Sequence, residues 1–193
     1  GDAVETIVPV YEEHGTPDVV IGNLPYNSAA AIILRIFEIG CISRAMVFTV
    51  QREAADRIIA EPGTSNYSSF SVVCRTAWKI ERLGDLKPGS FYPRPGVVST
   101  ILRFSPAETK QPTDRLMFLT LCRCLFASRR KTILNNLRAC TKTKNLNQTD
   151  IVQRLNQAGI DSSARAESAD PIQIAGLVES LRKTILCRNR GGN

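Results

Sequence analysis

The stretch of residues 18–39 restricts the fold of this chain more than any other part of the sequence. Its three β-branched residues at positions 19–21 are typical of a buried parallel strand. Gly22 and Pro25 end that strand in a tight turn, because glycine weakens a strand and proline lacks the N–H group. An apolar helix follows directly, with Ser28 as its N-cap. This order of elements indicates an α/β fold.

The next segments repeat the same order of strand and helix. Residues 44–51 are expected to form a second strand that runs directly into a helix over residues 52–60. Ser65 and Asn66 are expected to cap a further helix over residues 68–77. Alternating strands and helices predict a doubly wound, mostly parallel sheet.

Two more strands are expected at residues 78–86 and 97–104, joined by a loop rich in proline and glycine. The loop is too short for a helical crossover, so this pair of strands is predicted to be antiparallel. The same loop carries Phe91 and Tyr92. Aromatic residues on a stiff, exposed loop are more often a binding surface than part of a core, although packing of the loop tip on the domain is the alternative.

The strand pattern ends near residue 106. We therefore expect an α/β domain over residues 1–106, a polar hinge over residues 107–112 and a helical domain over residues 113–193. In the last segment, apolar residues recur at the spacing of a helix face. They are Leu116, Leu119, Cys122 and Phe126, followed by Ile133, Leu134 and Leu137.

Two helix starts can be recognised within this last segment. Thr149 or Asp150 is expected to cap a helix over residues 151–158. Asp170 followed by Pro171 is typical of an N-cap and the first position of a final helix.

The charge is distributed unevenly along the chain, whose net charge is +7. Residues 1–108 contain ten Lys or Arg and twelve Asp or Glu, a net charge of −2. Residues 109–193 contain fifteen and six, a net charge of +9. A strongly basic second part indicates a nucleic-acid partner, and a merely solvated basic surface is the alternative.

Several classes of protein are excluded by the composition. The most apolar stretch, residues 29–42, is interrupted by Arg35 and Glu38, so no membrane span or secretory signal is expected. The six cysteines form no CxxC pair and His14 is the only histidine, so we expect no metal site. These features predict reduced, mostly buried thiols in a cytosolic compartment. We expect a cytoplasmic monomer.

The turn of residues 23–26 is the best candidate for a binding site. Ligands of open α/β sheets bind at the carboxyl ends of the strands, where Asn23 and Tyr26 are expected to lie. A planar amino-heterocycle could stack on Tyr26 and donate hydrogen bonds to the side-chain oxygen of Asn23 and to a backbone carbonyl. The alternative is a turn that ends a strand and contains a half-buried tyrosine.

Five ordered motifs together resemble one family, the small-subunit ribosomal RNA adenine-N6 dimethyltransferases of the KsgA type. They are residues 23–27 (Asn-Leu-Pro-Tyr-Asn), 51–53 (Gln-Arg-Glu), 91–95 (Phe-Tyr-Pro-Arg-Pro), 128–132 (Ser-Arg-Arg-Lys-Thr) with Asn135 and Asn136, and 159–161 (Gly-Ile-Asp) with 165–167 (Arg-Ala-Glu). The resemblance implies a Rossmann-like methyltransferase sheet with a small all-α C-terminal domain. It also implies transfer of methyl groups from S-adenosyl-L-methionine to adenines in the RNA of a small ribosomal subunit precursor.

The resemblance assigns roles to particular residues. The expected catalytic residues are Asn23, Leu24, Pro25, Tyr26 and Phe91, the expected cofactor-binding residues are Asp2, Ala3 and Asn23, and the expected RNA-binding residues are Arg129, Arg130, Lys131 and Arg165. Two alternatives remain open for the last group. The run of residues 129–131 is also typical of a solvated helix face, and Arg165 could form an ion pair with Glu167 within its domain.

Two departures from the family pattern affect these expectations. After the aromatic loop the family usually has Lys-Val-Asp-Ser, whereas residues 96–99 read Gly-Val-Val-Ser. The glycine-rich cofactor loop and the acidic residue that binds the ribose are also absent, so we expect an N-terminally truncated methyltransferase that is inactive alone. The alternative is a non-catalytic RNA-binding or ribosome-assembly factor, and a DNA adenine methyltransferase is a third, weaker option.

Overall fold

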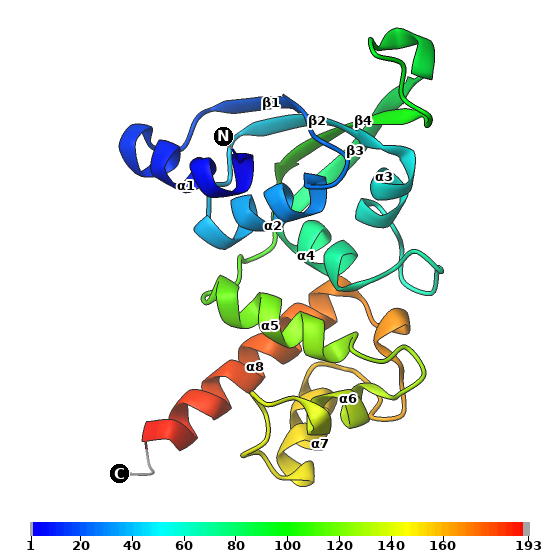
Figure 1. Ribbon diagram of the computed structural model, residues 1–193. Coiled ribbons are helices and arrows are strands. Elements are labelled where there is room, and N and C mark those ends of the chain that lie inside the picture. The colour runs from blue at the N-terminus through cyan, green and yellow to red at the C-terminus, as the bar shows by residue number, and fades with distance from the viewer. Residues whose placement is uncertain (1, 191–193) are drawn as a thin grey trace.

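The computed structural model describes residues 2–190, and it describes side chains for residues 2–187 (Figure 1). One sheet contains four strands in the order β1-β2-β4-β3, and they are β1 (Val19–Asn23), β2 (Ala45–Gln51), β4 (Ser99–Pro106) and β3 (Trp78–Leu86). β1 pairs with β2 in parallel, and β4 is antiparallel to both of its neighbours. Three strands therefore run in one direction and β4 runs in the other, which confirms the predicted sheet with its antiparallel β3–β4 pair.

The two central strands supply the middle of the core. In β2, Met46, Phe48 and Val50 are buried and alternate with partly exposed residues. Leu102 and Phe104 of β4 lie opposite Phe48 and Met46 in the register and are also fully buried. Because side chains of a strand alternate between two faces, these five residues form one continuous apolar face against which the helices pack.

Four helices belong to the half of the molecule that contains the sheet. They are α1 (Ala3–His14), α2 (Ala29–Ile39), α3 (Arg52–Ile58) and α4 (Ser69–Ala77). The local sequence pattern predicted α2, α3 and α4 but not α1, which contains Pro9 and buries none of its residues. The predicted cap of α4 was wrong, because Ser68 rather than Ser65 or Asn66 is its N-cap, in a capping box with Ser71.

The other half of the molecule is helical, as predicted. Its helices are α5 (Arg115–Leu125), α6 (Ile133–Ala139), α7 (Gln148–Gln157) and α8 (Pro171–Arg190). Asp170 caps α8 as expected, since its Oδ1 atom accepts a hydrogen bond from the Ile172 N–H group at 2.7 Å. The predicted caps of α7 were wrong, because Asn147 is the N-cap and Asp150 completes its capping box.

Cys124 and Cys140 form a disulfide that joins α5 to the residue after α6. The prediction that all six cysteines are reduced was therefore wrong. The two cysteines are 16 positions apart in sequence, and the packing of α5 against α6 brings them together. Cys74 and Cys122 are free and buried, and burial raises the pKa of both thiols. Buried protonated thiols pack like small apolar side chains.

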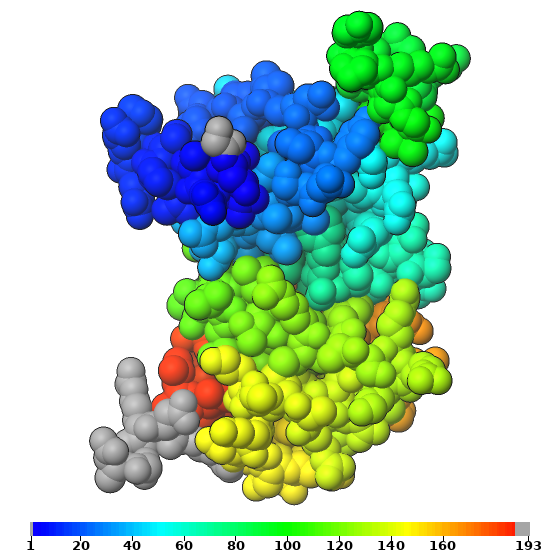
Figure 2. Space-filling model, viewed as in Figure 1, coloured from blue at the N-terminus to red at the C-terminus, as the bar shows by residue number. Residues whose placement is uncertain are grey.

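The connection between the two halves is held in place by hydrogen bonds. The side chains of Thr109 and Gln111 donate to the backbone carbonyls of Thr76 and Ala77 at the end of α4. The Tyr67 hydroxyl donates to the carbonyl of Ala169 at 2.9 Å, across the boundary between the halves. Figure 2 shows the helical half directly against the half that contains the sheet. The segment of residues 107–112, expected as a hinge, is therefore tied to the sheet half.

Candidate active site

The turn after β1 lies at the carboxyl edge of the sheet. Asn23 pairs with Thr49 in the register of β1 and β2, and the backbone N–H of Leu24 donates to the carbonyl of Thr49 at 3.0 Å. The carbonyl of Pro25 accepts hydrogen bonds from the N–H groups of Ser28 and Ala29, which start α2. Strand pairing holds the turn at one end, and the first turn of α2 holds it at the other.

Two acceptors in this turn are available to a ligand. The Asn23 side chain is exposed, and within the described residues neither its amide nor the Leu24 carbonyl has a hydrogen-bond partner. The Leu24 side chain is buried in the core, and this anchors the backbone beside Asn23. A side-chain amide and a neighbouring carbonyl can accept both N–H bonds of an exocyclic amino group.

The Tyr26 ring lies beside these acceptors and is 36% exposed. Its hydroxyl is 3.1 Å from the Oγ atom of Ser99, the first residue of β4. Ser99 is fully buried and lies opposite Gln51, the last residue of β2. The ends of β1 and β2 and the start of β4 therefore meet at Tyr26.

The aromatic loop between β3 and β4 projects beyond the end of the sheet (Figure 1). It begins with a short 3₁₀ helix, η1 (Pro88–Ser90), whose first carbonyl accepts a hydrogen bond from the N–H group of Phe91. Phe91 is half-buried and Tyr92 is fully exposed. Within the described residues the Phe91 ring makes no ring contact with Tyr26, so a sandwich of both rings around one base stays a prediction.

The start of β4 is supported by a charged network on the adjacent strand. Arg82 makes three hydrogen bonds to the Asp85 carboxylate, at 2.7, 2.9 and 3.2 Å, and also pairs with Asp56 of α3. The Thr100 hydroxyl donates to Asp85 at 2.7 Å. Hydrogen bonds from Arg82 and Thr100 lower the pKa of the Asp85 carboxyl, which therefore remains charged.

Asp2 and Ala3 lie at the start of α1 and are exposed, whereas Gly1 lies outside the described residues. The Oδ1 atom of Asp2 accepts a hydrogen bond from the Val4 N–H group at 2.9 Å and caps the helix. No hydrogen bond joins Asp2 to Asn23 within the part of the chain that the structure describes. Their shared role in cofactor binding stays a prediction.

The predicted RNA-binding residues 129–131 lie in the turn between α5 and α6 rather than on a helix, and their contact with RNA stays a prediction. Arg129 is engaged within the protein, since its Nη1 atom donates to the Ser65 carbonyl at 2.7 Å and its Nε atom donates to Glu167 at 3.0 Å. The suggested Arg165–Glu167 ion pair is wrong, because Glu167 pairs with Arg129.

Three of the four predicted RNA-binding cations remain available. Arg130, Lys131 and Arg165 are exposed, and their side chains have no ion pair or hydrogen bond within the described residues. In the sequence, Arg130 and Lys131 follow Arg129 directly, and Arg165 lies two positions before Glu167. Free, exposed cations in a basic half of the molecule suit phosphate contacts.

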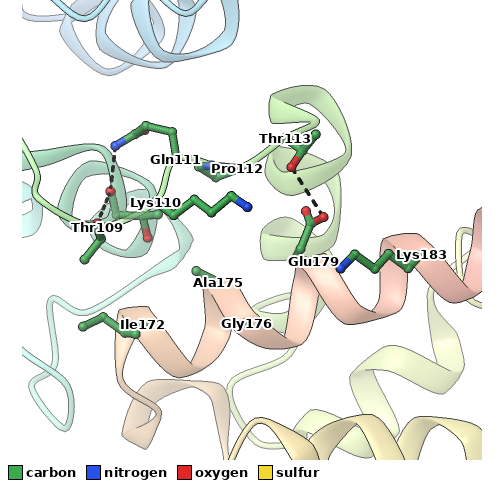
Figure 3. Close-up of a pocket in the computed structure, with 11 residues that line it drawn as sticks. Thr109, Lys110, Gln111, Pro112, Thr113, Ile172, Ala175, Gly176, Glu179 and Lys183 are labelled. Carbon is green, nitrogen blue, oxygen red and sulfur yellow. Dashed lines mark hydrogen bonds between the residues drawn. The ribbon is translucent and has the colours of Figure 1, made fainter.

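A hollow of about 360 Å³ lies between the end of α4, the connecting segment and α8 (Figure 3). Lys110 extends across it above α8, and Ile172, Ala175 and Gly176 form its apolar floor. Glu179 accepts a hydrogen bond from Thr113, and the Arg182 guanidinium lowers the pKa of the Glu179 carboxyl. No sequence motif pointed to this hollow, and none of the predicted site residues lines it.

The described residues contain neither a cluster of metal ligands nor a helix that could cross a membrane. No group of three or more metal-ligating side chains is present in residues 2–187. Nor does any helix in the part of the chain that the structure describes have the length and apolar character needed to cross a membrane.

Two solved structures of Rossmann-like methyltransferases share this fold of a mostly parallel sheet followed by a helical segment. The crystal structure of a dimethyladenosine transferase from Plasmodium falciparum is similar, with a TM-score of 0.75 at 23% identity over 87% of this chain and 69% of the other. The crystal structure of the 23S rRNA methyltransferase ErmE has a TM-score of 0.59 at 19% identity, over 85% of this chain and 65% of the other.

The family follows from the sequence comparisons. The sequence model of the ribosomal RNA adenine dimethylase family matches residues 5–183, and the chain belongs to that family. It is 38% identical over 170 residues to the ribosomal RNA small subunit methyltransferase A of Treponema denticola, covering 87% of this chain and 57% of the relative. The protein of the same name from Koribacter versatilis is 36% identical, covering 85% of this chain and 56% of the relative. The chain thus spans under two thirds of the length of these relatives.

Proposed function

We propose that this chain is the target-base and RNA-binding part of an enzyme that dimethylates adenine N6 in small-subunit ribosomal RNA. The observation that carries this proposal is the Asn23–Tyr26 turn, with two free acceptors beside a partly exposed aromatic ring at the carboxyl edge of the sheet. Membership of the ribosomal RNA adenine dimethylase family and the names of the relatives support it.

The turn suits an unstacked adenine. One face of the base stacks on Tyr26, and Phe91 is proposed to approach the other face from the loop between β3 and β4. Stacking of a base on an aromatic ring contributes about 1–3 kcal/mol. The Asn23 oxygen and the Leu24 carbonyl accept the two N6–H bonds, which selects an amino group over a carbonyl group at that position.

The same two acceptors assist the reaction. The N6 lone pair of adenine is delocalised into the ring, and hydrogen bonds accepted from N6–H favour the tetrahedral geometry in which that lone pair is nucleophilic. Asn23 is neutral and does not act as a base, so the proton leaves N6 after the new N–C bond has formed. The catalytic contribution of the chain is positioning and electrostatic stabilisation.

S-adenosyl-L-methionine supplies an electrophilic methyl group when it is bound. Asp2, Ala3 and Asn23 are the proposed contacts of this chain to it. Asp2 is suited to this role because only its Oδ1 atom is used in capping α1, which leaves the second oxygen of an exposed carboxylate for an amino group. The 193 residues contain no glycine-rich loop after a strand, so the polypeptide alone is proposed to be inactive.

The helical half is proposed to bind RNA. Its net charge of +9 over residues 109–193 and the free cations Arg130, Lys131 and Arg165 support phosphate contacts. In the proposed division, residues 1–106 form the partial methyltransferase domain and residues 113–193 the RNA-binding domain. The proposed partner is the small ribosomal subunit precursor, bound by a cytoplasmic monomer.

Calorimetry with S-adenosyl-L-methionine tests the proposal, with this chain compared to the chain extended N-terminally from its gene. We expect only the extended form to bind the cofactor and to methylate small-subunit ribosomal RNA, and we expect both forms to bind that RNA. Binding of RNA without any cofactor binding by the extended form would favour a non-catalytic ribosome-assembly factor. Cofactor binding by the 193-residue chain would show that a glycine-rich loop is dispensable and would contradict the proposal that this polypeptide alone is inactive.

A further inference from the structure

The hydrogen bond between Tyr26 and Ser99 joins two segments that are 73 positions apart in the chain. We propose that Ser99 is a positioning residue, which holds the Tyr26 ring in the orientation that stacks on the target adenine. The inference rests on the proposed function, because it assigns a role to the same site.

Ser99 is a rigid support for such a bond. Its side chain is fully buried, and β4 is paired on both sides, so that Ser99 lies opposite Gln51 in β2 and Leu86 in β3. The next residue, Thr100, is bound to Asp85, which Arg82 holds in turn. The Ser99 hydroxyl therefore has little freedom to move relative to the sheet.

Tyr26, in contrast, is weakly held apart from this bond. It lies in the turn between β1 and α2, over a third of its surface is exposed, and it makes no ring contact within the described residues. The bond to Ser99 is the only hydrogen bond of its side chain in that part of the chain. An exposed aromatic side chain without a restraint samples several rotamers, and binding a base selects one of them at a cost in entropy.

A purely structural role for Ser99 makes a different prediction. A buried hydroxyl needs a hydrogen-bond partner, and Tyr26 supplies it, so loss of the bond could reduce stability alone. If Ser99 positions Tyr26, loss of either hydroxyl has the same kinetic consequence, because both variants break one bond. The two roles are distinguished by whether the effects of the two variants on kcat are additive.

The experiment is a double-mutant cycle in the chain extended from its gene. Ser99→Ala, Tyr26→Phe and the double variant are assayed for kcat and KM on small-subunit ribosomal RNA. We expect each single variant to lower kcat by about threefold to tenfold, with unchanged affinity for S-adenosyl-L-methionine. The double variant is expected to be no slower than the slower single variant, and Ser99→Thr, which keeps the hydroxyl, is expected to retain most of the activity.

The matched control is Ser105→Ala on the same strand. The Ser105 hydroxyl donates to the Lys79 carbonyl at the exposed end of β4, and its loss is expected to leave kcat unchanged. Additive effects of Ser99→Ala and Tyr26→Phe, or wild-type kcat in Ser99→Ala, would overturn the positioning role.

Tyr26→Ala separates this inference from the proposed function. If Tyr26→Ala abolishes methylation while Ser99→Ala remains fully active, the positioning role fails and the proposed function stands. If the unaltered extended chain transfers no methyl groups to the RNA, the proposed function fails, and the positioning role fails with it.

Discussion

A single buried amide organises the turn that carries the proposed RNA-binding cations. The Asn136 side chain is 3% exposed, and its Nδ2 atom donates to the carbonyls of Leu125 and Ser128 at 2.7 and 3.0 Å. Leu125 is the last residue of α5, and Ser128 lies between α5 and α6. At the residue scale, Asn136 therefore closes the turn of residues 126–132, from which Arg130 and Lys131 extend.

Asn136→Ala is expected to lower the free energy of unfolding by about 1–3 kcal/mol, because the buried Leu125 carbonyl loses the donor that the side chain supplies, whereas the Ser128 carbonyl keeps the Lys131 N–H group. The adjacent Asn135→Ala is the matched control, since Asn135 is exposed and its side chain makes no hydrogen bond within the described residues. Urea denaturation of the two variants measures the difference. Equal stabilities would show that the Asn136 amide does not hold the turn.

Gly40 is the second residue whose identity the structure explains. It caps α2 with a φ of 76°, a left-handed conformation, and an added Cβ would lie 2.7 Å from the Nη1 atom of Arg115. The left-handed conformation disfavours a side chain at this position, and the Arg115 guanidinium would also have to move to admit one.

Gly40→Ala is expected to destabilise the protein by about 1–2 kcal/mol from the backbone conformation alone. Gly176→Ala is the matched control, because Gly176 lies within α8 and an added Cβ meets no atom within 4 Å. That control is expected to stabilise the protein by about 0.5–1 kcal/mol. Thermal denaturation should show shifts of Tm in opposite directions, and a lower Tm for Gly176→Ala would contradict this account.

At the scale of the elements, β3 and β4 are joined by side chains as well as by backbone pairing. Asp85 of β3 binds Thr100 of β4, and Arg82 connects both to Asp56 on α3. The lowered pKa of Asp85 follows from the hydrogen bonds donated by Arg82 and Thr100. A carboxyl whose pKa is lower in the folded state stabilises the fold above its ordinary pKa of 3.8, and this stabilisation is lost as the pH falls through the folded-state value.

Asp85→Asn is therefore expected to lower Tm at about pH 7 and to have a progressively smaller effect as the pH is lowered below the ordinary carboxyl pKa of 3.8. Melting curves followed by circular dichroism across this range provide the measurement. Asp18→Asn is a control on an exposed aspartate that makes no side-chain hydrogen bond within the described residues. If Asp85→Asn lowers Tm by the same amount across this pH range, the charge of Asp85 is not what stabilises the protein.

At the scale of the whole molecule, Arg129 connects the two halves. It bridges the Ser65 carbonyl, in the loop before α4, and Glu167, in the 3₁₀ helix η2 (Ala166–Ser168). The Gly63 N–H group also donates to the Glu167 carbonyl. These bonds give Arg129 a structural role that Arg130, one position further on, does not share.

Arg129→Ala and Arg130→Ala should therefore behave differently. We expect Arg129→Ala to lower the Tm of the protein, since it breaks contacts between the halves, and Arg130→Ala to leave Tm unchanged. Arg130→Ala is expected to weaken RNA binding and to reduce the slope of log K against log salt by about 0.7–1, the loss of one phosphate contact. An unchanged slope of log K against log salt would show that Arg130 does not contact an RNA phosphate.

Much of the fold and of the candidate turn was determined by the sequence alone. The strands, the antiparallel β3–β4 pair, the helical half and the position of residues 23–26 at the end of β1 all follow from local patterns of apolar residues, glycine and proline. These patterns act over neighbouring residues, which is why they can be recognised without the tertiary structure. α1 was missed because it buries no residue and contains Pro9, so its pattern is weak.

Only the tertiary structure decided which distant side chains meet. It places Ser99 against Tyr26, Glu167 against Arg129 rather than Arg165, and Cys124 against Cys140. Ser99 was visible in the sequence only as the last residue of an altered loop motif. Strand register and helix packing bring these pairs together, and both depend on contacts across the whole chain that no local pattern encodes.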